Sequence, residues 1–276
     1  MLDDRLADLD ALLAPLPGVL VAFSGGVDSG TLLAAAVRAL GADRVVAATA
    51  VSPSLPAAER TAAAAFAAWL GVRHEQPRTD ELSRAGYRAN AGDRCAFCKT
   101  ELVSVLVPLA DGLGIADVVT GTNADDLRAG FRPGIRAAAE RGAWTPLARA
   151  GLTKDDVRAA ARRWGLPLAE KPAAACLASR IAYGVPVSAQ RLARVERAEA
   201  DLRAALAGAG IDVRDLRVRD LGDTARVEVD ASAVPALAAR PDVLAAVAGF
   251  DRVELDPRGF RSGAMNELLP DPVRYR

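Results

Sequence analysis

The feature that most constrains the fold is a short apolar run that passes through a glycine-rich loop directly into a helical pattern. Gly18 to Phe23 (GVLVAF) is predicted as a buried strand, Ser24 to Ser29 (SGGVDS) as the loop, and Ser29 to Leu40 as a helix. Glycines let the backbone approach a ligand closely, and a helix N-terminus presents unpaired N–H donors at the positive end of its dipole. The segment therefore predicts a phosphate-binding loop within an α/β fold.

Three kinds of group in this loop can bind a phosphate and its counter-ion: backbone N–H donors, hydroxyls and a carboxylate. We expect the N–H donors to come from Gly25, Gly26 and Val27. The hydroxyls belong to Ser24 and Ser29, and the carboxylate belongs to Asp28. The carboxylate of Asp28 can hold Mg²⁺ or cap the first helical turn. The alternative is an ordinary glycine turn capped by Asp28 or Ser29. The loop is not a Walker A loop, because no Gly-Lys-Ser/Thr sequence follows it.

Up to about residue 169, short apolar runs alternate with longer amphipathic segments, as in βα units that wind a parallel sheet. The pattern predicts further strands at residues 44–51 and 117–120 and further helices at 57–70, 100–113 and 153–164. Thr153 is the expected N-cap of the last of these helices, and Gly165 is its expected stop. We therefore expect residues 1–185 to form an α/β domain with a doubly wound parallel sheet.

A second polar loop, Gly121 to Asp126 (GTNADD), follows the predicted strand at residues 117–120. In a doubly wound sheet, ligands lie beyond the carboxyl ends of the strands. We therefore expect Gly121, Asn123 and Asp126 to face the same crevice as the first loop. The alternative is a local turn in which asparagine and aspartate cap a helix.

From residue 186 the pattern changes to that of a smaller α+β domain, residues 186–276. It predicts a helix at 188–206, a hairpin of strands 212–219 and 225–230 with its turn at Gly222–Asp223, a helix at 234–247 and a strand at 252–255. Arg217 and Arg219 alternate around Val218, so both project from one face of the first hairpin strand. Two guanidinium groups on one face can bind a phosphate. A solvated face with cross-strand ion pairs is the alternative.

The charge balance limits the class of partner. The chain has 35 basic and 35 acidic residues, which gives a formal net charge of zero, so non-specific polyanion binding by bulk electrostatics is excluded. A hydrophobic content of 51% is ordinary for a globular protein. Residues 1–10 contain four aspartates and no basic region followed by an apolar run, unlike a secretory signal. We expect a cytoplasmic protein with no membrane or nucleic-acid partner.

The chain has three cysteines, and an odd number excludes a closed disulfide framework. Cys95 and Cys98 form a CxxC motif, whose spacing suits a metal, a cluster or a redox disulfide. Cys176 lies 78 residues beyond Cys98 among alanines, where a buried hydrophobic thiol is the alternative. A zinc site needs a fourth ligand, and His74 is the only histidine of the chain.

Seven segments together resemble the LarE family over about residues 1–270. They are SGGVDSG at 24–30, GTNADD at 121–126, TPL at 145–147, AGLTK at 150–154, KPAAACLASRIAYG at 171–184, RVRDLGDTARVEV at 217–229 and FRSGAMN at 260–266. The loop at 24–29 by itself resembles the PP-loop of the ATP pyrophosphatase superfamily, which has a HUP-like fold. The resemblance implies an ATP site at the two polar loops and a C-terminal domain for substrate binding and oligomerisation.

The resemblance implies that ATP and Mg²⁺ adenylate a carboxylate of pyridinium-3,5-biscarboxylic acid mononucleotide and release pyrophosphate. A sulfur nucleophile then displaces AMP and leaves a thiocarboxylate, and two rounds convert both carboxylates. The product is a precursor of the nickel-pincer nucleotide cofactor. The implied partner is this small nucleotide substrate, and the implied assembly is a homo-oligomer, a hexamer as in the family.

The family supplies sulfur in two ways. In one, a lone cysteine at the position of Cys176 gives up its own sulfur and becomes dehydroalanine. In the other, three cysteines hold a [4Fe-4S] cluster whose fourth iron carries a hydrosulfide, and Cys95, Cys98 and Cys176 match that set. The resemblance further implies catalytic roles for these cysteines, substrate contacts by Ser179, Arg180, Arg217 and Arg219, and a divalent ion at Glu199 and Glu228.

Other interpretations stay open at this point. Another PP-loop adenylating enzyme, either a tRNA thiolase or an ammonia-using synthetase, shares the first loop. Zero net charge argues against a tRNA substrate, and the lack of a glutaminase segment argues against an amidotransferase. A non-catalytic nucleotide or iron–sulfur binding module is the third interpretation.

Overall fold

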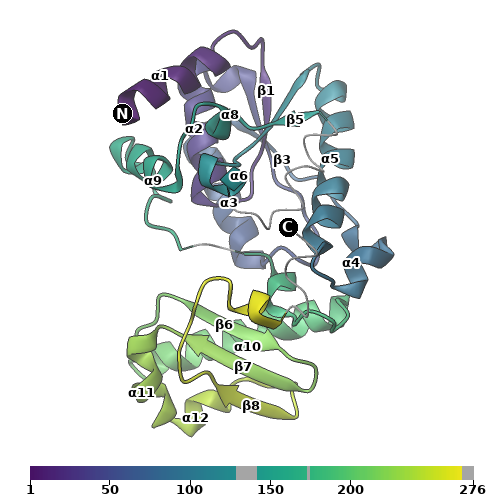
Figure 1. Ribbon diagram of the computed structural model, residues 1–276, viewed down its shortest axis with the longest axis vertical. Helices are drawn as coiled ribbons and strands as arrows, with labels where there is room; N and C mark the ends of the chain where they lie inside the picture. Colours follow the sequence, from purple (N-terminus) through teal and green to yellow (C-terminus); the bar gives the residue numbers. More distant parts are fainter. Residues whose placement is uncertain (129–141, 173–174, 269–276) are drawn as a thin grey trace. The chain divides into compact units, whose positions relative to one another are not determined.

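The computed structural model describes residues 1–128, 142–172 and 175–268, which form two compact units (Figure 1). Within these residues, one unit comprises Met1–Glu81 with residues 95–172, and the other comprises Leu82–Arg94 with residues 175–268. The expected domain boundary at residue 186 stays a prediction, since the compact units do not follow a single cut of the chain. None of the helices in the described ranges combines the length and apolarity needed to span a bilayer.

A five-stranded, entirely parallel sheet organises the first unit (Figure 1). Its strands, in spatial order, are β3 (Arg73–Glu75), β2 (Val45–Ala48), β1 (Val19–Ala22), β4 (Asp117–Thr120) and β5 (Ala143–Trp144). Val19 of β1 is in register with Val45 on one side and with Asp117 on the other. This order places the topological switch point between β1 and β4, where ligands bind in such sheets.

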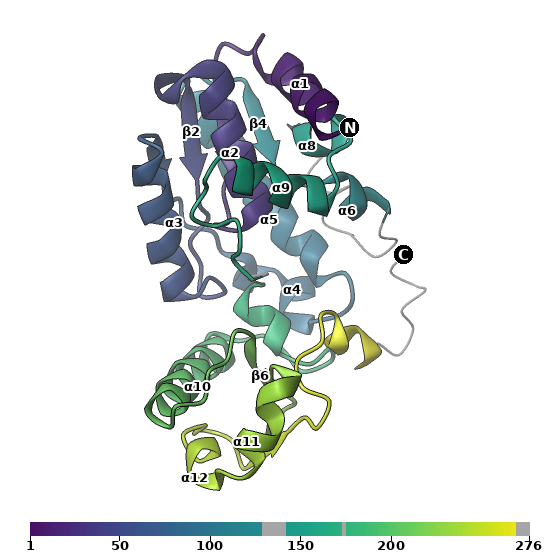
Figure 2. The ribbon, with the colours of Figure 1, turned by 90° about the vertical axis from the view of Figure 1, so that its left-hand side faces the viewer.

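Helices cover both faces of this sheet, because alternate residues of each strand point to opposite faces. Val19 and Val21 lie in an apolar core with helices α1 (Leu2–Leu13), α2 (Val27–Leu40), α3 (Ala57–Trp69) and α9 (Lys154–Arg163). Leu20, between them in the sequence, lies in a second core with helix α5 (Arg94–Gly112). Figure 2 shows α2, α9 and α1 together on one side of the strands. The predicted doubly wound α/β fold is confirmed.

The remaining elements of the first unit are short. They are α6 (Ala124–Arg128), α8 (Pro146–Arg149) and the 3₁₀ turns η1 (Ala42–Arg44) and η2 (Glu81–Ser83), of which η2 extends into the second unit. Helix α9 begins as predicted, because the Thr153 hydroxyl and the Asp156 backbone and side chain form a reciprocal capping box. Gly165 follows it with φ +62°, as expected for a helix stop. Helix α5 begins at Arg94, six residues before the predicted start.

The second unit contains a three-stranded sheet in the order β6 (Leu216–Asp220), β7 (Thr224–Val229), β8 (Arg252–Leu255). Strands β6 and β7 form the predicted antiparallel hairpin, with Gly222 in its turn at φ +105°. Strand β8 runs parallel to β7. The long helix α10 (Ala189–Gly208) packs on β6 through Leu202 and Leu206, and the predicted smaller α+β fold is confirmed.

The rest of this unit consists of single turns of helix: α4 (Ala85–Ala89), η3 (Leu177–Arg180), η4 (Ala231–Ala233), α11 (Val234–Ala238), α12 (Pro241–Leu244) and η5 (Ala264–Leu268). The single helix predicted at residues 234–247 is wrong. Pro241 lacks a backbone N–H and cannot continue α11, so it starts α12 instead.

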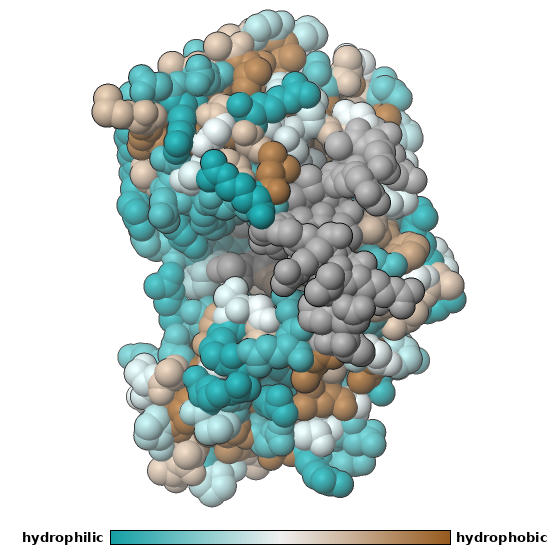
Figure 3. All heavy atoms as spheres, viewed as in Figure 1, coloured by the Kyte–Doolittle hydropathy of each residue, from teal (hydrophilic) through white to brown (hydrophobic). Residues whose placement is uncertain are grey.

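Polar side chains dominate the face of the protein seen in Figure 3, and apolar residues form small, separate patches there. Among the described residues, four large hydrophobic side chains are exposed: Met1, Trp69, Leu127 and Leu268. Scattered exposed apolar residues are ordinary on a folded protein. The function therefore has to be sought in polar sites rather than in an apolar surface.

Candidate functional site

The SGGVDS loop connects the carboxyl end of β1 to the first turn of α2. Gly25 has φ +76°, a left-handed conformation that glycine adopts without strain. The Ser24 and Ser29 hydroxyls lie 3.1 Å apart, and the Ser29 hydroxyl donates to the Gly26 carbonyl at 3.2 Å. The serines therefore fix the shape of the loop. The 14-residue helix that follows begins at the loop. Its first N–H groups, which have no acceptor within the helix, and its positive dipole end therefore face the loop.

The GTNADD loop follows the carboxyl end of β4, the strand next to β1, and it contacts the first loop directly. A Cβ atom on Gly121 would lie 2.6 Å from the Ser29 backbone nitrogen, so only glycine fits at this point. The buried Asn123 side chain donates from Nδ2 to Asp28 Oδ1 at 3.0 Å. These two contacts bring Gly121 and Asn123 against the first loop, and their role in binding ATP stays a prediction.

Asp126 has a local partner. Its Oδ2 accepts the Asn123 backbone N–H at 3.3 Å, while Asn123 Oδ1 accepts the N–H groups of Asp125 and Asp126 at 3.0 Å. This reciprocal pair begins helix α6 and fixes the orientation of the Asn123 side chain. Asn123 therefore carries the contact to Asp28, and a ligand contact by Asp126 stays a prediction.

Two lysines, which the sequence analysis did not single out as site residues, hold the loop from other directions. Lys154, the first residue of α9, forms an ion pair through Nζ with Asp28 Oδ2. Lys171 Nζ donates to the Gly25 carbonyl at 2.9 Å and to Glu59 Oε2 at 2.6 Å. Both lysines lie in the motifs AGLTK and KPAAAC, which were the signal that could have found them.

The loop region combines oriented N–H donors, two hydroxyls and two ammonium groups. Asp28 and Glu59 balance the two ammonium charges, and each carboxylate is about three-quarters buried, with 23% of its side-chain surface exposed. Such a set of donors suits an anion with several oxygens, a phosphate above all.

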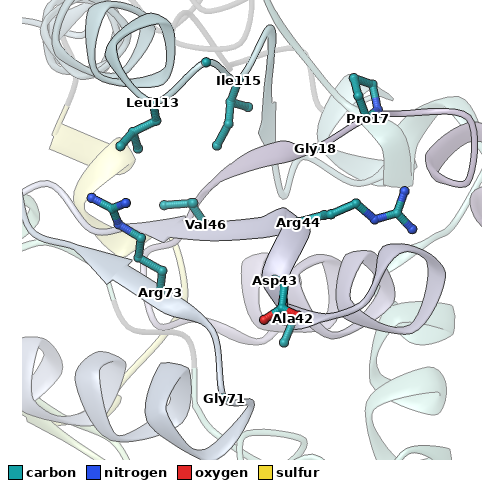
Figure 4. A pocket seen from close by; sticks show the side chains of 11 residues that line it. Pro17, Gly18, Ala42, Asp43, Arg44, Val46, Gly71, Arg73, Leu113 and Ile115 are labelled. Carbon is teal, nitrogen blue, oxygen red and sulfur yellow. The ribbon is translucent and has the colours of Figure 1, made fainter.

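Among the described residues, one pocket lies at each end of the strands. The pocket at the carboxyl ends of β2 and β3, the end that carries the loop, has a volume of about 480 Å³. It is lined by Val51, Ser52, Pro53, Arg60, Gln76, Arg78, Thr79, Asp80 and Glu101. The other, of about 410 Å³, lies where the strands begin, and Figure 4 shows Val46, Leu113 and Ile115 on its walls with Arg44 and Arg73 on opposite sides. Of these two pockets, the one at the carboxyl ends of the strands lies on the same side of the sheet as the loop, and its lining includes no residue of the loop.

The CxxC motif occupies the first turn of α5. Cys95 is exposed and Cys98 partly buried, and residues three apart on a helix share a face. Cys176 is also exposed and immediately precedes the turn η3, where its carbonyl accepts the Ser179 N–H at 3.0 Å and the Ser179 hydroxyl at 2.7 Å. All three cysteines are thiols rather than half-cystines. Ala173 and Ala174 of the same motif lie outside the described residues.

The three cysteines are distributed over the two compact units. Cys95 and Cys98 belong to the first unit and Cys176 to the second. Within residues 1–128, 142–172 and 175–268, no three His, Cys, Asp or Glu side chains are grouped as metal ligands. The iron–sulfur ligand set therefore stays a prediction.

A buried ionic cluster follows Cys176 in the second unit. Arg180 forms a two-point ion pair with Glu199 at 2.9 and 3.2 Å, and Arg219 binds Glu228 Oε2 through two nitrogens at 2.7 and 3.0 Å. Arg217 lies on β6 two residues before Arg219, and its guanidinium carbon lies 5.0 Å from the centroid of the Phe260 ring. The cluster thus brings three guanidinium groups and two carboxylates together.

Of the alternative considered in the sequence analysis, the solvated face is wrong, because Arg217 is 8% exposed and Arg219 5% exposed. Its cross-strand ion pair is present, since Arg219 of β6 binds Glu228 of β7. Burial, and next the nearby positive charge of Arg180, lowers the pKa of Arg217. Arg180 Nη1 and Arg219 Nη1 contact Ser179 at its hydroxyl and carbonyl, 3.2 and 3.3 Å away, so the cluster reaches the residues next to Cys176.

The carboxylates of Glu199 and Glu228, which were expected to hold a divalent ion, are instead held by arginines. Glu199 Oε1 also accepts the Val218 backbone N–H at 3.1 Å. A metal role for these residues stays a prediction, and the structure supports their role in orienting Arg180 and Arg219.

The parallel sheet of order 3-2-1-4-5, with the SGGVDS loop at its switch point, defines the class of the chain: an α/β protein with a HUP-like domain. No protein-family model matches it. The pyridinium-3,5-bisthiocarboxylic acid mononucleotide synthase of Lactiplantibacillus plantarum is 34% identical over 268 residues, which cover 96% of this chain and 95% of that protein. The chain therefore belongs to the family of this synthase, the LarE family.

Two further relatives have no described activity in their names. Uncharacterized protein slr1717 of Synechocystis sp. is 40% identical over 274 residues, which are 98% of this chain and 99% of the relative. Uncharacterized protein MJ0830 of Methanocaldococcus jannaschii is 30% identical over 141 residues, about half of each chain. The first of these relatives matches both compact units.

Proposed function

We propose that this protein is an ATP-dependent sulfurtransferase that converts a carboxylate of pyridinium-3,5-biscarboxylic acid mononucleotide into a thiocarboxylate. The reaction belongs to the biosynthesis of the nickel-pincer nucleotide cofactor. The family relationship supports sulfur transfer to this nucleotide, since a relative that matches nearly the whole chain is named as the synthase of the thiocarboxylate product.

The observation that carries the ATP-dependent step is the contact between the two polar loops at the switch point. Asn123 binds Asp28, and Gly121 packs against Ser29, so the carboxyl ends of β1 and β4 form one polar site. A glycine-rich loop at a helix N-terminus binds the phosphates of a nucleotide through its backbone. Asp28 is the carboxylate placed to share Mg²⁺ with those phosphates.

Adenylation makes the carboxylate a substrate for sulfur. A carboxylate oxygen attacks the α-phosphorus of ATP, the bond from that phosphorus to the bridging oxygen breaks, and pyrophosphate leaves with the electron pair. The acyl adenylate then has AMP as its leaving group. A sulfur nucleophile forms a C–S bond, and AMP departs with the electrons of the C–O bond. Each thiocarboxylate formed therefore consumes one ATP.

The second unit supplies the groups that suit the substrate nucleotide. Arg217 and Arg219 lie side by side along β6 and bring guanidinium donors for its phosphate, and Glu228 holds Arg219 in place. Ser179 and Arg180 lie next to Cys176, where a carboxylate would have to approach the sulfur. The binding of the substrate near Cys176 is the arrangement that this unit favours.

For the sulfur source we assign Cys95, Cys98 and Cys176 as ligands of a [4Fe-4S] cluster. The donor set fits, because all three are thiols and Cys95 and Cys98 share one face of the first turn of α5. When bound, a cluster with three protein thiolates supplies sulfur at its remaining iron. The alternative is that Cys176 gives up its own sulfur.

A pyrophosphate-release assay tests the proposed activity. With Mg²⁺, ATP and the dicarboxylate mononucleotide, we expect pyrophosphate and AMP in equal amounts, and no release when the mononucleotide is omitted. Asp28→Asn should lower the rate by roughly 100-fold or more, as expected for a lost charge that holds the metal. An absence of ATP cleavage on addition of the mononucleotide would rule out the proposed function.

Anaerobic purification tests the sulfur source. We expect a brown protein with four irons and four sulfides per chain, a fifth sulfide when the remaining iron carries a hydrosulfide, and loss of the iron in Cys95→Ser, Cys98→Ser and Cys176→Ser. The intact mass should be unchanged after turnover. A colourless, iron-free protein whose mass falls by about that of H₂S, with the change located at Cys176, would instead establish the sacrificial route.

A further inference from the structure

Lysine is rare in this chain. Of its 35 basic residues, 32 are arginine and three are lysine: Lys99, Lys154 and Lys171. Arginine therefore supplies the cation at nearly every position where either residue would serve. A lysine in such a chain points to a position where a compact ammonium on a flexible stem differs from a planar guanidinium.

Two of the three lysines contact the SGGVDS loop, one near each end. Lys171 contacts the Gly25 carbonyl and Glu59, and Lys154 contacts Asp28 on the first turn of α2. Among the ion pairs of the described residues, arginine supplies every other side-chain cation. Within the described residues, the ion pairs that use lysine therefore occur at the SGGVDS loop.

An ion pair that only stabilises the fold does not explain why these two positions have lysine rather than arginine. Elsewhere in the chain a carboxylate that must be held firmly is gripped by a guanidinium fork, as Glu199 is by Arg180. An ammonium makes weaker, single-point contacts and can rotate from one anion to another. Lys154 and Lys171 are 38% and 21% exposed, so both side chains reach solvent at the loop.

We propose that Lys154 and Lys171 are catalytic residues that contact ATP: their ammonium groups bind its β- and γ-phosphates and hold the pyrophosphate as it leaves. This inference rests on the proposed function. When the bond from the α-phosphorus to the bridging oxygen breaks, the electron pair stays on the pyrophosphate, and ammonium groups on both sides of the loop stabilise that charge. Asp28 and Glu59 hold the same ammonium groups before the nucleotide arrives.

The charge of the site explains why both lysines are required. Without Lys171, Glu59 would present an uncompensated carboxylate to a triphosphate, and without Lys154, Asp28 would have only Mg²⁺ to offset its charge; like charges close together repel. A neutral variant would therefore lose binding for two reasons at once. Substitution by arginine keeps the charge and tests the ammonium alone.

The first experiment measures binding by calorimetry on the full chain with Mg²⁺. The ligands are α,β-methylene-ATP, pyrophosphate and AMP, and the variants are Lys154→Arg and Lys171→Arg. We expect each variant to bind the first two ligands at least tenfold more weakly and AMP within twofold of wild type. The matched control is Arg162→Lys, an exposed pair with Glu170 in the same unit, which should bind all three as wild type does.

The second experiment needs no variant. Because the chain has three lysines, acetic anhydride labelling read by mass spectrometry reports on each of them. We expect α,β-methylene-ATP and pyrophosphate to protect Lys154 and Lys171 at least fivefold from acetylation, and AMP to leave both unprotected. Lys99 serves as the internal reference and should label equally in all samples.

Two results separate the inference from the function on which it rests. If wild type binds the ATP analogue, but both arginine variants bind it equally well or neither lysine is protected, the assignment of the lysines is wrong and the proposed function stands. If wild type binds neither the analogue nor pyrophosphate, the proposed function is wrong, and the inference with it.

Discussion

Single residues decide whether the two polar loops can meet. The identities of Ser24, Asp28 and Asn123 were predictable, because a strand, a polar loop and a helix follow one another in the sequence. Glu59, Lys154 and Lys171 were not singled out, because they reach the loop from separate helices and loops. Lys171 lies 146 residues from the glycine that it contacts. Sequence patterns describe neighbours along the chain, and these contacts are set by the packing of whole elements.

Gly121 provides the sharpest test of the close approach between the loops. In Gly121→Ala, the new Cβ would lie 2.6 and 2.7 Å from backbone atoms of Ser29, so one loop must move. We expect a loss of about 1–3 kcal/mol in the free energy of unfolding and at least tenfold weaker ATP binding. Urea denaturation and calorimetry measure the two effects.

The matched control for that substitution is Gly112→Ala at the end of α5, where a Cβ would meet nothing within 4 Å. It should leave ATP binding unchanged and alter stability by no more than about 1 kcal/mol. Equal behaviour of the two variants would contradict the role given to Gly121.

His74, the only histidine, predicts a pH dependence. The Thr49 hydroxyl donates to the Phe23 carbonyl at 2.7 Å, so it accepts at 2.9 Å from His74 Nε2, which must carry the proton of the neutral ring. Burial lowers the pKa of His74 below its ordinary value of 6.5. As the pH falls through 6.5, the unfolded chain takes up the proton more readily than the folded one, and stability decreases.

The measurement is the free energy of unfolding of wild type and His74→Gln between pH 8 and pH 5. The difference in the free energy of unfolding between the two proteins should be constant above pH 7. As the pH falls below 6.5, wild type should lose stability relative to His74→Gln. A difference that is independent of pH would show that His74 does not titrate differently on folding.

At the scale of elements, two strands were predicted with the bounds that the structure gives them. Strands 117–120 and 252–255 lie where expected, because each is a short apolar or alternating run between turn signals. The start of α5 was placed six residues late, at residue 100 instead of Arg94. The N-terminal helix Leu2–Leu13 was not foreseen, although its Leu9 and Leu13 are buried in the core.

Asn90 is the residue that fixes one irregular segment. It is fully buried with φ +54°, and its Nδ2 donates to the carbonyls of Ile181, Ala182 and Val185 at 3.3, 2.8 and 2.8 Å. Its Oδ1 accepts from Arg94, which in turn donates to the Ala178 carbonyl at 2.8 Å. This one side chain therefore holds residues 82–94 against the segment that follows Cys176.

Removal of the Asn90 side chain should loosen that segment. In Asn90→Ala, three carbonyls each lose one donor, and we expect a loss of at least about 2 kcal/mol in stability together with faster hydrogen exchange in residues 177–185. Asn90→Gly removes the same bonds but tolerates the positive φ, so it should be less destabilised than Asn90→Ala by about 1 kcal/mol. Unchanged exchange in both variants would contradict this account.

At the scale of the whole molecule, the alternation of strands and helices was enough to predict a doubly wound sheet followed by an α+β region. The division into compact units was beyond sequence reasoning. Residues 82–94 join the second unit through Asn90, whose partners lie 91 to 95 residues away. A local sequence pattern does not predict a contact between residues so far apart in the sequence.

Zero net charge makes a prediction for the molecule as a whole. A tRNA-modifying enzyme needs an extended basic surface, and its binding weakens steeply with salt. We expect no binding of bulk tRNA tighter than roughly 10 µM at 150 mM salt, measured by fluorescence anisotropy. Tight, salt-sensitive binding would instead favour a tRNA thiolase.

The separation along the chain between the SGGVDS loop and the residues that hold it has a consequence for synthesis on the ribosome. Residues 24–29 are made before Asn123, Lys154 and Lys171, which hold them. At common translation rates, the 142 residues between Ser29 and Lys171 take roughly 7–28 s. A growing chain therefore lacks these contacts to the SGGVDS loop during that time, and they cannot assist the folding of β1 and β2.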